Sequence, residues 1–314
     1  MTLSHDPAPW LMDQDGWAAV RGRRLLDLDR EGDRQAVQAF VRELAEEQRP
    51  DGSFSGSLMK TAGVLSLLSD VGPSSADRMI ARGAGYLLSV LESQPGYGTA
   101  AAVKPGSLQT PFDLCGFFGP YEDRALPEAV AHGAREMNYY REYEPLTGPK
   151  SPVRTAGRSS LHRMGPTSCY SWGLIPLCYT IETLCRAGHA HDVRLQPAIN
   201  ALLGAQRRSG GWCRNLGGHP NCTLHAARAV GAHPELQSSE WAEHALRGMR
   251  GRWKGTQAFA AMQAVASFQV PSARETISEL LASVAPRQRK NGAFGGPCPV
   301  ERVCAVLLAI RAIA

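Results

Sequence analysis

Four cysteines and one histidine stand next to glycine- or proline-rich segments of the sequence. They are Cys169, Cys213, Cys222, His225 and Cys298. Cys222 and His225 are three residues apart, a spacing that places two side chains on one face of a helix. Because thiolate and imidazole groups are preferred ligands of Zn²⁺, this pattern predicts a zinc site. Its expected ligands are Cys213, Cys222, His225 and Cys298.

The alternative for these thiols is packing, because cysteine is among the most frequently buried residue types. Packing is our interpretation for Cys178, Cys185 and Cys304, which lie inside apolar helical runs. For the four expected zinc ligands both interpretations stay open, since their spacing is not that of a standard zinc finger. Cys169 is retained as a candidate catalytic thiol.

One acidic residue, Asp113, lies in the apolar segment 110–118. A carboxyl group removed from water has a raised pKa and can act as a general acid at neutral pH. Asp113 is therefore the second catalytic candidate, and the alternative is that it caps a turn. The basic segment 141–167 is expected to receive an anionic group, such as a diphosphate or a carboxylate, or to be a solvated loop. His219 and His233 are expected to be solvated loop residues.

Charged residues are scattered along the chain rather than clustered. The 34 basic and 29 acidic residues give a net charge of +5, without the basic stripe that is typical of nucleic-acid binding. No apolar run approaches the ~18 residues of a membrane-spanning helix. The first residues lack the basic start and apolar run of a secretory signal. We therefore expect no nucleic-acid partner, no transmembrane segment and a cytoplasmic location, where cysteines stay reduced.

Three segments share one signature, in which Gln and Arg are followed by a turn residue, a Gly and, two residues later, an aromatic. They are QRPDGSF at 48–54, QRRSGGW at 206–212 and QRKNGAF at 288–294. The spacings are 158 residues (206 − 48) and 82 residues (288 − 206), both close to multiples of about 40. Weaker copies occur at 94–98 and 251–255. The chain therefore accommodates six or so repeats.

Between the signatures, apolar residues recur with helical periodicity. Segments 61–68, 223–230 and 303–310 are apolar on most faces, whereas 34–44, 198–203 and 276–283 are amphipathic. The alternation of β-branched residues that marks strands is nearly absent. One buried and one exposed helix per repeat predict an all-α ring with an inner and an outer layer. We expect residues 1–314 to form one domain, with 1–33 as an N-terminal extension.

With Gln, Asp-Gly or Gly-Gly, and an aromatic at about 40-residue intervals, residues 37–314 resemble the repeats of protein prenyltransferase β subunits and squalene–hopene cyclases. The resemblance implies an (α/α)6 toroid with a central cavity. It also implies a zinc site with Asp, Cys and His ligands. Cys222 stands at the Cys position, whereas Pro220 and Cys298 stand at the Asp and His positions. The Asp-x-Asp-Asp and Asp-Asp-x-x-Asp motifs of terpene cyclases are absent.

Three functions are compatible with this sequence. The first is a small-molecule enzyme with a central active site and a zinc–thiolate centre. The second is a terpenoid cyclase or prenyl transferase without the usual acidic motif, and the third is a non-catalytic toroid that binds a ligand or a protein. The expected partners are a small-molecule substrate and, beyond it, a helical partner subunit or a second copy of the chain.

Overall fold

The computed structural model describes this chain as an all-α protein. The described residues are 3–28, 30–56, 58–71, 76–93, 174–204, 206, 210–212, 220–249, 253, 257–296 and 298–314. Within these ranges helices are joined by turns, no strand is formed, and the β-type pairs are three isolated bridges. No helix of the described ranges is both long and apolar enough to cross a membrane. The expectation of an all-α fold is confirmed.

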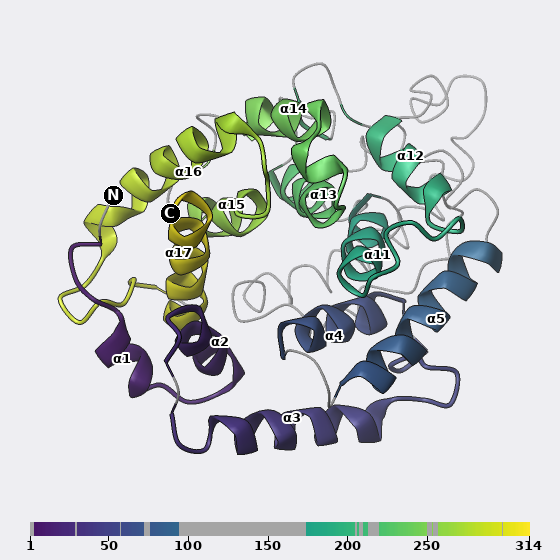
Figure 1. The fold of residues 1–314 in the computed structure, drawn as a ribbon, viewed down its shortest axis with the longest axis horizontal. Coiled ribbons are helices and arrows are strands. Elements are labelled where there is room, and N and C mark those ends of the chain that lie inside the picture. Colours follow the sequence, from purple (N-terminus) through teal and green to yellow (C-terminus); the bar gives the residue numbers. More distant parts are fainter. Residues whose placement is uncertain are drawn as a thin grey trace, which may run out of the picture.

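The helices alternate along the chain between an outer and an inner layer (Figure 1). The outer layer contains α1 (Ala8–Met12), α3 (Asp33–Glu47), α5 (Asp77–Ser93), α12 (Gln196–Gly204), α14 (Glu240–Met249) and α16 (Pro271–Val284). The inner layer contains α2 (Trp17–Leu25), α4 (Leu58–Val71), α11 (Leu174–Arg186), α13 (Pro220–Ala232), α15 (Gln257–Val265) and α17 (Pro299–Ile313). Two short 3₁₀ helices, η5 (Leu236–Ser238) and η6 (Ala285–Arg287), lie in the connections. The predicted buried and amphipathic segments occupy the inner and outer layers respectively.

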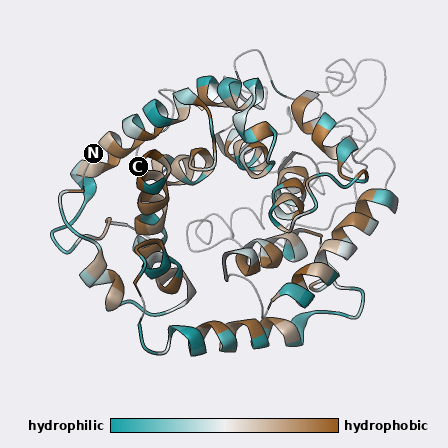
Figure 2. Ribbon diagram, in the orientation of Figure 1, coloured by the Kyte–Doolittle hydropathy of each residue, from teal (hydrophilic) through white to brown (hydrophobic). Residues whose placement is uncertain are grey.

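The inner helix α15 and the outer helix α3 show the contrast in burial that the hydrophobic patterns predict. The inner helix α15, nine residues long, buries Ala258, Phe259, Ala261, Met262, Ala264 and Val265. The outer helix α3, 15 residues long, buries Val37 and Val41. Figure 2 shows the same contrast, with apolar residues over much of the inner helices and polar faces on the outer ones. The inner layer is therefore held mainly by apolar burial from several sides.

The inner helices pack against one another in sequence. α4 packs against α11, α11 against α13, α13 against α15, and α15 against α17. α17 then packs against α2, and α3 contacts both α2 and α4. The packing of the described helices therefore runs through a complete circuit, and the last helix of the chain lies beside one of the first (Figure 1).

The three signature segments form the same turn between an outer and an inner helix. In each, the Gln forms an antiparallel bridge with the aromatic residue. In the first turn, Gln48 Nε2 donates to the Gly52 carbonyl at 3.0 Å and to the Met79 carbonyl of the next outer helix at 2.9 Å. The aromatic residue of each turn has no exposed surface, whether it is Phe54, Trp212 or Phe294. The signature therefore marks a turn that ties one repeat to the next.

Glycine is required in these turns for two reasons. Gly52, Gly210 and Gly292 have φ of 88°, 85° and 84°, which L-residues with a side chain rarely adopt. In addition, a Cβ at any of them would overlap a backbone carbonyl oxygen of the following outer segment, such as that of His244 for Gly210. The close approach lets the Gln side chain reach the neighbouring repeat.

The last turn makes its inter-repeat contacts with the N-terminal segment. Gln288 Nε2 donates to the His5 carbonyl at 2.7 Å, and the His5 amide donates to Gln288 Oε1 at 3.0 Å. In the first turn the equivalent partner is α5, which is the next outer helix. At the last turn, the segment leading into α1 thus occupies the position that the following outer helix, α5, has at the first turn.

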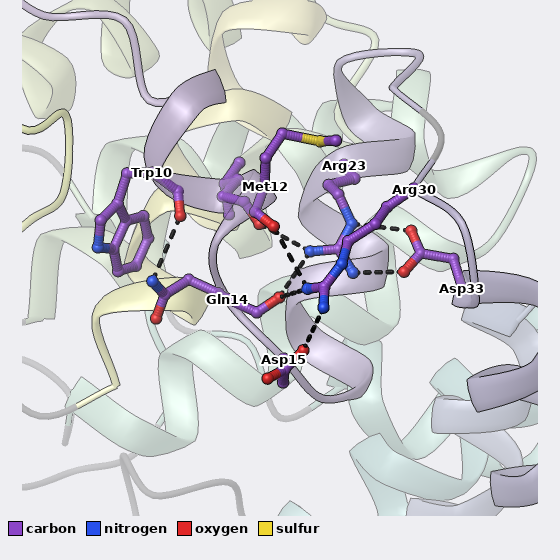
Figure 3. Close-up of polar contacts among 8 residues, drawn as sticks. Trp10, Met12, Gln14, Asp15, Arg23, Arg30 and Asp33 are labelled. Atoms are coloured by element: carbon purple, nitrogen blue, oxygen red, sulfur yellow. Dashed lines mark hydrogen bonds and ion pairs between the residues drawn. The ribbon is translucent and has the colours of Figure 1, made fainter.

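Two arginines connect the N-terminal helices and the segments between them through hydrogen bonds (Figure 3). Arg23 of α2 is 1% exposed and donates to Asp33 Oδ2 at 2.8 Å and to the carbonyls of Leu11 and Gln14 at 2.7 and 2.8 Å. Arg30 donates to the same Gln14 carbonyl at 2.8 Å. Within residues 1–33, which the sequence suggests as an extension, the structure places α1 in the outer layer and α2 in the inner layer.

Candidate functional site

Three of the six residues predicted to do chemistry lie outside the described residues: Asp113, Cys169 and Cys213. Cys222 lies in the first turn of α13, and its side chain is outside the description as well. The structure therefore places two of the predicted side chains, His225 and Cys298.

His225 and Cys298 stand near the beginnings of two different inner helices. Cys298 is the N-cap residue of α17, has φ of 56°, and is buried. His225 is in the second turn of α13 and is buried too. Because α15 packs between α13 and α17, these two residues are not on neighbouring inner helices. Across the described ranges, no group of three His, Cys, Asp or Glu side chains is placed to hold a metal ion.

The environment of His225 fits a metal ligand in one respect and opposes it in another. Burial, and secondarily the Arg228 guanidinium, lowers the pKa of His225 to about 3. The imidazole is therefore neutral, which is the form that binds a metal. A guanidinium beside it repels a divalent cation, however. Of the four predicted zinc ligands, the structure places one imidazole, His225, and one buried thiol, Cys298, so a zinc site would depend on Cys213 and Cys222 for the remaining ligands.

The cysteines predicted to be core residues are buried. Cys178, Cys185 and Cys304 are 0%, 8% and 1% exposed, which confirms the packing interpretation. Burial, with a contribution from the charge of Glu182, raises the pKa of Cys185 to about 12. Its thiol is therefore protonated at neutral pH and is a poor nucleophile.

A polar cluster that the sequence analysis missed connects three consecutive inner helices. We call it the Glu182 cluster, and it consists of Ser66 on α4, Tyr179, Glu182 and Arg186 on α11, and His225 and Arg228 on α13. Tyr179, Glu182 and Arg186 are spaced i, i+3, i+7, so they lie along one face of α11. The available signal was Glu182 itself, the one acidic residue of a helix that is otherwise largely apolar.

Glu182 is the centre of this cluster. Arg228 donates to Glu182 Oε1 from Nε at 3.2 Å and from Nη2 at 2.8 Å. Arg186 Nη1 lies 3.8 Å from the same oxygen and donates to Ser66 Oγ at 3.0 Å. The carboxylate therefore faces two guanidinium groups that come from different helices.

Aromatic contacts complete the Glu182 cluster. The ring of Tyr179 lies 4.8 Å from that of His225, centroid to centroid, with the planes tilted by 42°. The Arg228 Cζ lies 6.0 Å from the centroid of the Tyr179 ring. This distance is at the outer limit of a cation–π interaction. The cluster thus combines a carboxylate, two guanidiniums, a phenol and a neutral imidazole between α11 and α13.

Another arginine of the inner layer is buried away from the Glu182 cluster. Arg302 of α17 is 3% exposed, and its Cζ lies 5.1 Å from the centroid of the Phe259 ring on α15. A Cβ on Gly296 would overlap the guanidinium, so the absence of a side chain at Gly296 makes room for it. Arg228 lies within segment 223–230 and Arg302 directly precedes segment 303–310, two of the segments that the sequence analysis describes as apolar on most faces.

The interpretation of His233 as a solvated loop residue is wrong. His233 is 5% exposed. It follows α13 directly, and its ring centroid lies 5.8 Å from that of His191 in a T-shaped arrangement. Its Nδ1 accepts a hydrogen bond from the Glu235 amide at 3.2 Å. The other histidine of this interpretation, His219, lies outside the described residues.

Comparison of the chain with protein-family models, with curated proteins and with solved structures gives no match. The resemblance to prenyltransferase β subunits and squalene–hopene cyclases therefore stands on the repeat motifs alone.

Proposed function

We propose that this protein is a closed (α/α)6 toroid that binds and converts a small molecule at the centre of its ring. The observation that carries the proposal is the Glu182 cluster within the inner layer. Removing charged groups from water costs several kcal/mol per ion before pairing compensates. Apolar residues would hold α11 and α13 together more simply, and groups kept at such a cost are concentrated at functional sites.

The arrangement of helices supports the toroid. Outer and inner helices alternate along the described chain, the inner ones pack in a circuit, and the last turn binds the N-terminal segment. An (α/α)6 ring needs all three properties. Residues 94–173 stand in the sequence between the outer helix α5 and the inner helix α11, so an insertion there would leave the alternation of layers intact.

The proposed chemistry follows the family resemblance. Prenyl transfer or cyclisation of an isoprenoid substrate is the reaction class that the repeats suggest, with Asp113 and Cys169 as candidate catalytic residues. We also propose a zinc ion held by Cys213, Cys222, His225 and Cys298, which would activate a thiol or act as a Lewis acid. Reduced thiols are needed for such a site, so the proposal includes a cytoplasmic location.

Metal analysis of the purified protein tests the zinc proposal. About one zinc ion per chain is expected, and Cys222→Ala should abolish it. Cys178→Ala is the matched control, because Cys178 is a buried core thiol that should not affect metal content. Absence of metal from the folded, reduced protein would contradict the zinc site.

Incubation with farnesyl or geranylgeranyl diphosphate tests the reaction class. Formation of a cyclised or transferred product supports it, and Asp113→Asn and Cys169→Ala should then reduce the rate. If neither product nor binding is observed, the isoprenoid substrate is excluded.

A further inference from the structure

We propose that the Glu182 cluster is a subsite for an oxyanion, namely the phosphate or carboxylate group of the molecule bound in the ring. This inference rests on the proposed function for the existence of that molecule. The shared chemistry is a planar or tetrahedral group of oxygens that accepts several N–H donors, which guanidinium groups match best.

The distribution of exposure within the cluster supports this role. The Glu182 side chain is 7% exposed, whereas those of Arg186 and Arg228 are 26% and 28% exposed. The carboxylate is thus more deeply buried than either guanidinium it faces. A buried carboxylate behind two more exposed guanidiniums holds them in place without covering them.

The charges of the cluster favour an anion. Glu182 carries one negative charge, and the two arginines carry two positive charges. Glu182, Arg186 and Arg228 therefore sum to one positive charge in a partly buried position, where attraction of an anion is stronger than in bulk water.

Both guanidiniums are fixed before any ligand arrives. Arg228 uses Nε and Nη2 for Glu182 and packs near the Tyr179 ring, and Arg186 is fixed by Ser66. Immobilised donors lose little side-chain entropy when a ligand binds, which increases affinity.

An exposed arginine pair shows what a structural ion pair looks like in this protein. Arg194 donates to Asp192 from Nε at 2.9 Å and from Nη2 at 2.7 Å. The two residues are two positions apart in the chain, and one guanidinium binds one carboxylate. No second guanidinium shares the carboxylate in the described contacts, so Arg194 provides a matched control.

Calorimetric titration of the intact protein with inorganic pyrophosphate, and separately with octanoate, tests the subsite. We expect one of the two anions to bind with one-to-one stoichiometry, and the arm that binds identifies a phosphate or a carboxylate group. Arg228→Gln should weaken this binding about tenfold or more, and Arg186→Gln should weaken it several-fold. Arg194→Gln removes the same charge and should leave the affinity within about twofold of the wild type.

Glu182→Gln distinguishes a built subsite from general attraction to positive charge. This variant makes the cluster more positive, so simple attraction would tighten binding. We expect weaker binding, because the guanidiniums lose the carboxylate that orients them. Circular dichroism of every variant verifies folding, and Arg186→Gln, the less deeply paired substitution, keeps the test valid if Arg228→Gln unfolds.

The subsite is excluded if the folded wild type binds neither anion, or if Arg186→Gln and Arg228→Gln bind as well as the wild type. Tighter binding by Glu182→Gln would overturn the positioning role of the carboxylate. Because calorimetry needs no turnover and no metal, these outcomes are independent of the zinc and product assays. The subsite can therefore fail while the proposed enzyme function stands, and the reverse.

Discussion

The signature turns and the Glu182 cluster are both polar structures beside the inner helices, but they differ in repetition. The Gln–Gly–aromatic turn occurs at 48–54, 206–212 and 288–294 with the same bridge and the same Gln-to-Gly hydrogen bond. Among the residues that the structure describes, the Glu182 cluster is formed once, between α4, α11 and α13. A structure that is repeated meets a need common to all repeats, whereas one that occurs once meets a local need.

The two regions also differ in the free-energy cost of burying their polar groups. The turns join neutral amide groups to backbone carbonyls, which satisfies buried polar groups at modest cost. The cluster buries a carboxylate with two cations, which costs more than an apolar contact of equal size. We infer that the turns specify how successive helix pairs are joined, whereas the cluster meets a need local to α11 and its neighbours.

Gly210→Ala should produce the largest loss of stability. Its φ of 85° disfavours alanine, and the new Cβ would overlap the His244 carbonyl oxygen. We expect a loss of about 3 kcal/mol or more in the free energy of unfolding, measured by urea denaturation. Gly188→Ala is the matched control, with φ of 87° and no atom within 4 Å of the added Cβ. It should cost about 1 kcal/mol. Equal losses would show that the close approach of the turn has no energetic role.

Gln288→Ala tests whether the last turn closes the ring. Gln288 makes hydrogen bonds to the Gly292 carbonyl and, in both directions, to the backbone of His5. We expect a loss of about 2 kcal/mol in urea unfolding and faster proteolysis of the N-terminal segment. Gln206→Ala is the comparison, since among the described residues Gln206 Oε1 has no donor. Its loss should be about 1 kcal/mol. A smaller effect at Gln288 than at Gln206 would contradict closure by this turn.

Glu182→Gln should lower stability less than either turn substitution, by about 1 kcal/mol. The arginines around Glu182 are about a quarter exposed, so water replaces part of the lost attraction. Thermal unfolding at low and high salt measures this effect, and the difference from wild type should shrink at high salt. An unchanged difference would mean that packing, rather than charge, makes Glu182 important.

The sequence alone predicts the repeated part of this molecule well. The Gln–Gly–aromatic spacing predicts turns between outer and inner helices, and the structure has these turns at all three places. The reason is that each of these repeats forms the same turn, so the same residue pattern recurs in the sequence. The aromatic residue of the pattern is Phe54 in the first turn and Trp212 in the second. The apolar character of 61–68, 223–230 and 303–310 likewise identifies inner helices, because their burial comes from many sides.

The unrepeated part is predicted poorly. Arg228 and Arg302 each lie in an inner helix whose other residues are largely apolar. A charged residue in such a helix does not reveal its partner, since Glu182 is 46 residues away from Arg228. The cysteine spacing directed attention to Cys298 and His225, which the structure places on helices separated by α15. Chemistry that arises from three-dimensional contacts has no fixed sequence spacing.

The smallest effect expected is a pH dependence at the ends of the helices that carry the Glu182 cluster. Burial lowers the pKa of His233, which follows α13, below its ordinary value of 6.5. Its Nδ1 accepts the Glu235 amide hydrogen, so protonation would break that bond. As the pH falls through 6.5, the unfolded chain binds a proton that the folded chain does not, and stability falls.

His233→Gln should therefore flatten the decline in the free energy of unfolding between pH 7 and pH 5.5, by less than about 1 kcal/mol. Urea denaturation at several pH values measures the slope, and His244→Gln controls for the loss of a histidine on another helix. If His233→Gln keeps the wild-type slope, the histidine takes up its proton equally in the folded and unfolded states, and its contact with the Glu235 amide is not a fixed hydrogen bond. The segment that follows α13 would then be adaptable, and the fixed geometry would be limited to Glu182 and its arginines.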